Sequence, residues 1–190
     1  MKTLIYSLSF SVLLLAACSE NSQKDQSKVQ MSSMDTSNTM AVNSKKRSST
    51  TSLINSYLKL KNALATDNDK GAAAAGNEMV IGFTNFDSKS LNSEQGKVYM
   101  DVQEAAKEHA EHISSNIGNL AHQREHFDML SVDMYDLIKA LGTSLPLYVD
   151  HCPMYNNNKG AIWLSEMKEI KNPYLGKAMP NCGNVKEKVE

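Results

Sequence analysis

Between residues 51 and 142 the chain repeats apolar side chains at three- and four-residue spacing, and this periodicity constrains the fold more than any other feature. Such spacing lines the apolar side chains along one face of an α-helix. The pattern covers 51–65, resumes after Asp69, opens again at Ser93 and, after one more break, stops at Gly142. Asp69 and Ser93 are residue types that cap helix N-termini, and Gly142 is typical of a C-terminal stop. Because short connections make consecutive helices antiparallel neighbours, we predict a mainly α fold built on a four-helix bundle.

The pattern of the sequence changes after Pro146. Residues 147–149 are typical of a strand, 156–160 of a turn, and 161–164 of a returning strand. We therefore expect a small irregular or β C-terminal extension. Bundle and extension together form one domain, residues 50–190, which is long enough to bury a core of its own.

Residues 1–17 are typical of a secretory signal peptide, with Lys2 followed by an apolar run over 4–17. That run is shorter than the roughly 20 residues of a membrane-spanning helix. The run ends in Leu-Ala-Ala-Cys, which resembles the bacterial lipoprotein box, so we expect cleavage after residue 17 and lipidation of Cys18. An ordinary signal peptide before an incidental cysteine is the alternative. The lipid would anchor the protein in the cell envelope, facing the periplasm or in the outer membrane, where disulfides persist.

The segment 19–49 has 9 Ser among 31 residues and contains no aromatic residue, Leu or Ile. It lacks the apolar surface needed to order itself, so we predict that 18–49 is a lipidated cysteine followed by a disordered tether. The whole chain carries 20 basic and 21 acidic side chains, a formal net charge of −1. This balance excludes the basic surface of a nucleic-acid-binding protein.

Four of the 5 histidines fall between residues 109 and 126. His109 and His112 are three residues apart and His122 and His126 four apart, so each pair shares a helix face. A break at Gly118 folds the two helices together, which puts both pairs at similar heights, so that the four could cluster near one end of the bundle. The alternative is that His109 is a core residue and the others lie on the surface. His109 belongs to the third apolar stripe, which consists of Val98, Val102, Ala106, His109, Ile113 and Ile117.

Cysteine and methionine side chains form a second group of candidate metal ligands. Cys152 and Met154 lie two residues apart, and Met179 and Cys182 follow about 25 residues later. Thiol and thioether ligands together select soft ions such as Cu(I). With Cys18 lipidated, however, Cys152 and Cys182 are the two remaining thiols, and outside the cytoplasm such a pair commonly forms a disulfide. Metal site and disulfide both stay open at this point.

Five ordered blocks resemble a bacterial family, domain of unknown function 3347, over residues 52–189. The blocks are YLKLKNAL at 57–64, HAEHI at 109–113, HQREHFDMLS at 122–131, CPMYNNNKGAIWLS at 152–165 and EIKNPYLGKAMPNCG at 169–183. Members of that family occur as lipoproteins and fused to the periplasmic adaptors of copper and silver efflux systems. The resemblance therefore implies a metal-handling role and a copper or silver efflux partner. The family motifs match His109, His112, Ile113, His122, Gln123, Arg124, His126, Phe127, Cys152, Pro153, Met154, Asn172, Pro173, Tyr174, Gly176, Met179, Cys182 and Gly183.

We accordingly expect an envelope lipoprotein that binds a soft or borderline metal ion, with copper preferred over zinc or silver, as a buffer, chaperone or efflux accessory. The alternative is a structural or interaction module stapled by a Cys152–Cys182 disulfide, without metal. We expect no enzyme, because no HExxH-type motif supplies a general base. Arg124 is expected to donate hydrogen bonds from the bundle to the tail. The predicted metal ligands are Cys152, Met154, Met179 and Cys182, with His109, His112 and His126 in a nearby or second site.

Overall fold

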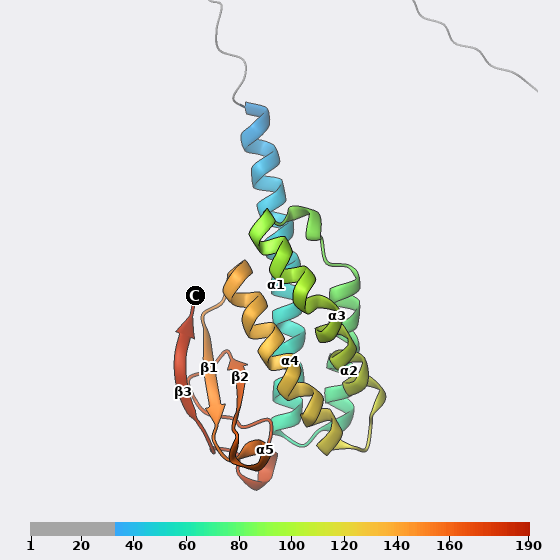
Figure 1. Ribbon diagram of the computed structural model, residues 1–190, viewed down its shortest axis with the longest axis vertical. Coiled ribbons are helices and arrows are strands. Elements are labelled where there is room, and N and C mark those ends of the chain that lie inside the picture. Colours follow the sequence, from blue (N-terminus) through green and yellow to red (C-terminus); the bar gives the residue numbers. More distant parts are fainter. Residues whose placement is uncertain (1–32) are drawn as a thin grey trace, which may run out of the picture.

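The structure is a computed structural model that describes residues 33–190, with side chains from residue 49 on. It is mainly helical, with a small antiparallel sheet near the C-terminus, as the sequence predicts (Figure 1). The predicted signal peptide and Cys18 lie outside the described residues. The helices of the bundle are α1 (Ser33–Ala65), α2 (Asp69–Thr84), α3 (Ser93–Ser115) and α4 (Leu120–Leu141), with a short 3₁₀ helix, η1 (Ser88–Ser90), between α2 and α3.

Helix α1 is much longer than the predicted 51–65, because it already includes residues 33–50. It therefore extends into the segment that the composition assigned to a disordered tether. The helical part of that segment contains neither Gly nor Pro, and a helix already nucleated by the packed residues after 50 gains one hydrogen bond for each residue added. Within the described part of the chain, no helix is both long enough and apolar enough to cross a membrane.

Two helix N-caps lie one residue before the predicted ones, while the helices themselves begin at Asp69 and Ser93. Asn68, not Asp69, caps α2 by accepting from the amide of Gly71 at 2.9 Å. Asn92, not Ser93, caps α3 in a reciprocal capping box with Gln95. The side-chain oxygen of an asparagine accepts from the unpaired amides of the first helical turn, as that of an aspartate or a serine does. The sequence alone therefore did not decide which of two adjacent residues is the cap.

The predicted stripe of α3 is displaced at both ends. Tyr99 is buried where Val98 was expected, and its ring stacks on Phe86 with centroids 4.4 Å apart. Ile117 is 58% exposed, because α3 ends at Ser115 and the chain turns away from the core. Ala106 and Ile113 are buried as predicted.

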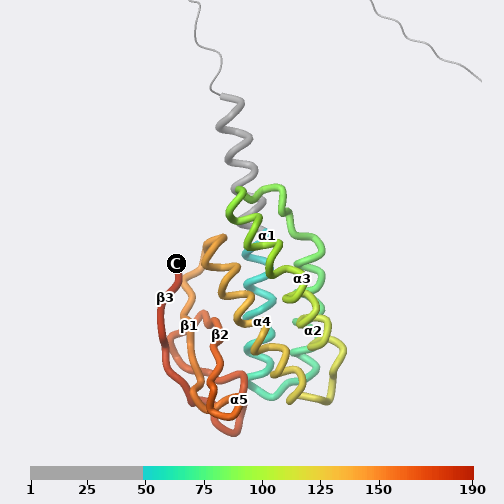
Figure 2. The backbone as a smooth tube through the Cα atoms, viewed as in Figure 1, coloured from blue at the N-terminus to red at the C-terminus, as the bar shows by residue number. Residues whose placement is uncertain are grey.

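The four helices pack in chain order, α1 on α2, α2 on α3 and α3 on α4, while α1 and α4 touch much less. The seam between α1 and α4 is covered by the sheet, which lies along the outside of α4 (Figure 2). The C-terminal extension thus completes the bundle. Its strands β1 (Leu147–Cys152), β2 (Ala161–Ser165) and β3 (Asn184–Val189) pair antiparallel in the order β2-β1-β3.

Strand β3 was not predicted. Val189 is its one buried residue, so apolar and polar side chains alternate only weakly along it. The turn expected at 156–160 is present, and most of its backbone is left-handed. It begins with the short helical segment α5 (Tyr155–Asn158), in which Asn156, Asn157 and Asn158 all have φ between 52 and 64°. Asparagine tolerates this left-handed conformation better than most residues.

Tyr57 joins the bundle to the sheet. Its ring stacks on Phe127 of α4 with centroids 5.3 Å apart, and its hydroxyl lies 2.7 Å from the Ser131 hydroxyl. The same oxygen accepts from the amide of Leu164 in β2 at 3.1 Å. A single buried side chain of α1 therefore contacts both α4 and β2.

Arg124 ties the tail to the bundle, as predicted. Its guanidinium donates to the Leu64 carbonyl at 3.0 Å, to the Pro173 carbonyl at 2.8 Å and to the Asp67 carboxylate at 2.5 Å. The 3₁₀ turn η2 (Gly176–Ala178) approaches so closely that a Cβ on Gly176 would overlap a carboxylate oxygen of Asp67.

We expect Arg124→Lys to destabilise the fold by about 2 kcal/mol, because a lysine cannot serve two carbonyls and a carboxylate in one plane. The free energy of unfolding in urea, followed by circular dichroism, measures this loss. Lys107→Gln is the control: it removes an exposed pair with Glu111 at 3.7 Å, and its cost should stay below about 0.5 kcal/mol. Equal losses in the two variants would contradict the anchoring role of Arg124.

Candidate metal centre

The turn between α3 and α4 sets the register of the two helices that carry the histidines. Gly118 holds φ at 88°, and its amide donates to the Asp69 carboxylate at 2.7 Å. The fully buried Gln123 amide nitrogen donates to the carbonyls of Asp69 and Ile113, at 3.0 and 3.1 Å. These bonds hold the beginning of α2, the end of α3 and the beginning of α4 together, so residues equidistant from the turn face each other.

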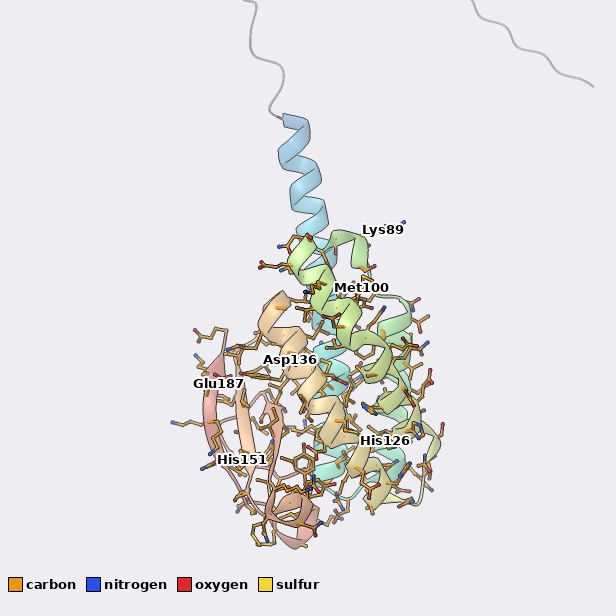
Figure 3. The ribbon with its side chains drawn as sticks, in the orientation of Figure 1. Lys89, Met100, His126, Asp136, His151 and Glu187 are labelled. Carbon is orange, nitrogen blue, oxygen red and sulfur yellow. The ribbon has the colours of Figure 1, made fainter. Side chains whose placement is uncertain are left out.

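All four histidines of this hairpin meet around His126. The Nδ1 atoms of His109 and His126 are 3.1 Å apart. The rings of His112 and His126 are stacked, with centroids 4.1 Å apart and an interplanar angle of 6°. The His122 ring meets the His126 ring edge-on at 4.6 Å. We call these four residues the histidine cluster; Figure 3 shows His126 on the part of α4 that lies toward the α3–α4 turn.

Three members of the cluster have the geometry of a cation site. One ring nitrogen from each of His112, His122 and His126 lies within 4.8 Å of the others. Imidazole nitrogens bind zinc at about 2.0–2.1 Å, so small side-chain rotations bring three such nitrogens onto one ion. The separation of 3.1 Å between His109 and His126 is also close to the roughly 3.3 Å expected for two nitrogens at a tetrahedral angle on one metal.

Of the two alternatives that the sequence left open, the structure has the four histidines together, but the predicted ligand set differs from the three-histidine group by one residue. His109, His112 and His126 were predicted as ligands, whereas His122 belongs to the group in place of His109. The four-residue spacing of His122 and His126 was the signal that pointed to this member. Helix spacing indicates which side chains share a face; the rotamers that aim each nitrogen depend on packing between the helices.

The surroundings of His109 and His126 favour the neutral form of these two imidazoles. Burial, followed by the neighbouring His112, His122 and His109, lowers the pKa of His126 to about 4. Burial also lowers the pKa of His109. Both rings are thus uncharged at neutral pH, and a metal ion that binds them displaces no proton from these two.

Two carboxylates flank the cluster. Glu108 lies 3.8 Å from the Nε2 atom of His112, and Glu125 lies 3.4 Å from the Nδ1 atom of His122. Carboxylates beside ligating histidines orient the rings and add negative charge near a cation. The outer rim of the cluster is therefore acidic, whereas its inner member, His126, is neutral.

The predicted sulfur residues are only partly brought together. The sulfurs of Cys152 and Cys182 are 3.8 Å apart, and both residues are free thiols. Cys152 is fully buried, Cys182 is half-buried, and burial together with the Cys152 contact raises the pKa of Cys182. Met154 and Met179 are surface side chains, 48 and 41% exposed, so the four-sulfur site stays a prediction.

Residues 53–145 match the family model described as a protein of unknown function (DUF3347). The match covers the packed helices and all four residues of the histidine cluster. It ends before β1, so the Cys152 and Cys182 motifs lie beyond it, although the resemblance was expected to reach residue 189. No curated protein and no solved structure matches the chain.

Asp133 lies two turns after His126 on α4, and its carboxyl group should make the stability of the folded protein depend on pH. Burial first, and Asp136 second, raise its pKa from 3.8 to about 6. The folded state then holds the proton more tightly than the unfolded state, so this contribution to stability is lost as pH rises from about 4 to about 6. Asp133→Asn should match the wild type at pH 4 and be about 1 kcal/mol more stable at pH 7.5, allowing for solvent screening.

Urea unfolding at the two pH values measures this difference. The exposed Asp136→Asn is the control, and it should change the same difference by less than half as much. A stability difference for Asp133→Asn that does not depend on pH would contradict the burial of an ionised carboxylate.

Proposed function

The chain belongs to the DUF3347 family, and we propose that it is a cell-envelope lipoprotein that binds a copper ion at the histidine cluster. The observation that carries this proposal is the convergence of three imidazole nitrogens within 4.8 Å, with His109 as a fourth imidazole beside them. Because His109 and His126 are uncharged at neutral pH, no proton has to leave these two rings before a cation binds.

The chemistry of the ligand set supports copper. Imidazole suits copper, zinc and nickel, and among divalent ions of this row the affinity of a nitrogen site is greatest for Cu²⁺. The low pKa of His126 keeps a ligand lone pair free at neutral pH, and the flanking Glu108 and Glu125 attract a cation. Zinc is the competitor for this site, and silver would be a candidate at sulfur ligands.

The location follows from the first residues of the sequence. The predicted cleavage after residue 17 leaves Cys18 as the lipidated N-terminus, and the lipid anchors the domain at the membrane surface. Imidazole ligands at the membrane surface would bind an ion and could pass it on. Such a site fits the role of a buffer, a chaperone or an accessory of copper and silver efflux. This is a binding role, and we propose no catalytic reaction.

We expect the histidine cluster to bind one Cu²⁺ per chain without help from sulfur. Isothermal titration of the full chain carrying Cys18→Ser, Cys152→Ser and Cys182→Ser measures this, because the substitutions prevent Cu²⁺ from oxidising thiols. His126→Gln in the same background should weaken binding by roughly 100-fold or more, since it removes the residue that all the other rings contact. Nitrogen hyperfine structure in the electron paramagnetic resonance spectrum should identify imidazole ligation.

His151→Gln is the matched control. His151 lies in β1, in the sheet and apart from His126 (Figure 3), so its loss should leave the copper affinity unchanged. Circular dichroism checks that each variant is folded. If the thiol-free chain binds no copper, or if His126→Gln and His151→Gln behave alike, the histidine cluster is not the metal site.

The anchor is tested separately by labelling with radioactive palmitate in a bacterium that processes lipoproteins. The wild-type chain should incorporate label, and Cys18→Ser should incorporate none, because the acyl group is carried on that sulfur. Cys182→Ser should keep the label. Label that persists in Cys18→Ser would place the acylation elsewhere.

A further inference from the structure

The two thiols of the tail are brought together by tertiary structure alone. Cys152 is the last residue of β1, and Cys182 lies in the loop before β3, 30 positions later, yet their sulfurs are 3.8 Å apart. A disulfide needs sulfurs about 2.05 Å apart, so side-chain rotation has to shorten the separation by less than 2 Å. The segment between the two residues contains α5, β2 and η2, and its end returns to β1 without any covalent link.

Cys152 and Cys182 differ in their exposure to solvent, and this difference assigns each a role in the reaction. Cys152 is fully buried, whereas Cys182 is half-buried and lies next to the surface residue Met179, whose carbonyl accepts from the Cys182 amide at 3.2 Å. A reagent from solvent therefore reaches Cys182 first. Cys152 has the position of the second, resolving thiol, because it contacts the sulfur that would be attacked.

We propose that Cys152 and Cys182 form a reversible dithiol–disulfide couple that clamps the C-terminal loop to the central strand of the sheet. This inference does not depend on the histidine cluster, which lies in the helical hairpin.

The oxidant is a disulfide, RSSR, either a small molecule or a protein partner. The Cys182 thiolate attacks one sulfur of RSSR, forms a mixed disulfide and releases RS⁻. The Cys152 thiolate then attacks the Cys182 sulfur, forms the internal disulfide and releases the second RS⁻. The two protons of the original thiols end on the two RSH products, and two electrons pass from the protein to RSSR.

The Cys152–Cys182 disulfide would constrain the loop before β3, whose backbone is held by hydrogen bonds to the Asn172 side chain. The fully buried Asn172 donates to the Cys182 carbonyl at 2.6 Å, and its own side-chain oxygen accepts from the amides of Tyr174 and Leu175, at 2.8 and 2.9 Å. The same loop carries the Pro173 carbonyl that Arg124 holds. Oxidation would thus fix one end of the loop to β1, while the other contact to the bundle stays in place, and reduction would leave that end held by hydrogen bonds alone.

The full chain carrying Cys18→Ser, which leaves Cys152 and Cys182 as its two thiols, tests the proposal. The protein is equilibrated with reduced and oxidised glutathione in several ratios, in the presence of a chelator, and then acid-quenched, alkylated and weighed by mass spectrometry. We expect one transition, in which both sulfurs become protected together and the protein loses the mass of two hydrogen atoms. The melting temperature of the oxidised form should exceed that of the reduced form by roughly 10 °C.

Single substitutions in the same background test the order of attack. Cys152→Ser should leave Cys182 as a stable glutathione adduct, and Cys182→Ser should leave Cys152 largely unmodified while the protein is folded. Accumulation of a glutathione adduct on the chain with both thiols, without the internal bond, would overturn the proposal. So would two thiols that stay reduced at every ratio, or a metal ion that remains bound to both sulfurs and prevents oxidation.

Discussion

The buried amide of Gln123 helps to fix the register of the two helices that carry the histidine cluster. Its nitrogen donates to two backbone carbonyls, one from the beginning of α2 and one from the end of α3, while Gln123 itself belongs to the first turn of α4. A slip of α4 along α3 would break both bonds inside a closed core, where an unpaired amide and two unpaired carbonyls are expensive. The helices are therefore held in one register, and a site that needs imidazoles from both helices becomes possible.

The second constraint is the seam between α1 and α4. Helices that met directly there would form a closed bundle, but in this protein β2 covers the seam, and Tyr57 bonds to α4 and β2 at once. Lys61, one turn further along α1, is fully buried and reaches Glu166 just after β2 at 2.9 Å. Tail and bundle consequently share a core, because buried side chains of α1 bond to residues in or next to β2.

Much of the fold was predictable because its signals are local. The helix patterns, the stop at Gly142 and the turn near residue 156 all depend on neighbours within a few positions, and the structure has each of them. The prediction failed where two residues had similar local merit, as with Asn68 and Asp69, or where a helix continued beyond its apolar stripe, as α1 does before residue 51. Strand β3 was missed because an edge strand with one buried residue carries little apolar alternation.

The candidate metal centre and the two thiols were likewise predictable only in part. The sequence by itself determined that each pair of histidines shares a helix face and that the two pairs lie at similar heights, because helical spacing decides the face and a single turn decides the height. It also determined that two thiols remain for the tail once Cys18 is assigned to the lipid. Only the tertiary structure decided that His122 joins His112 and His126, that Met154 and Met179 point to solvent, and that Cys152 meets Cys182. Those outcomes depend on rotamers and on loop paths between residues far apart in the chain, and packing of the whole domain selects them.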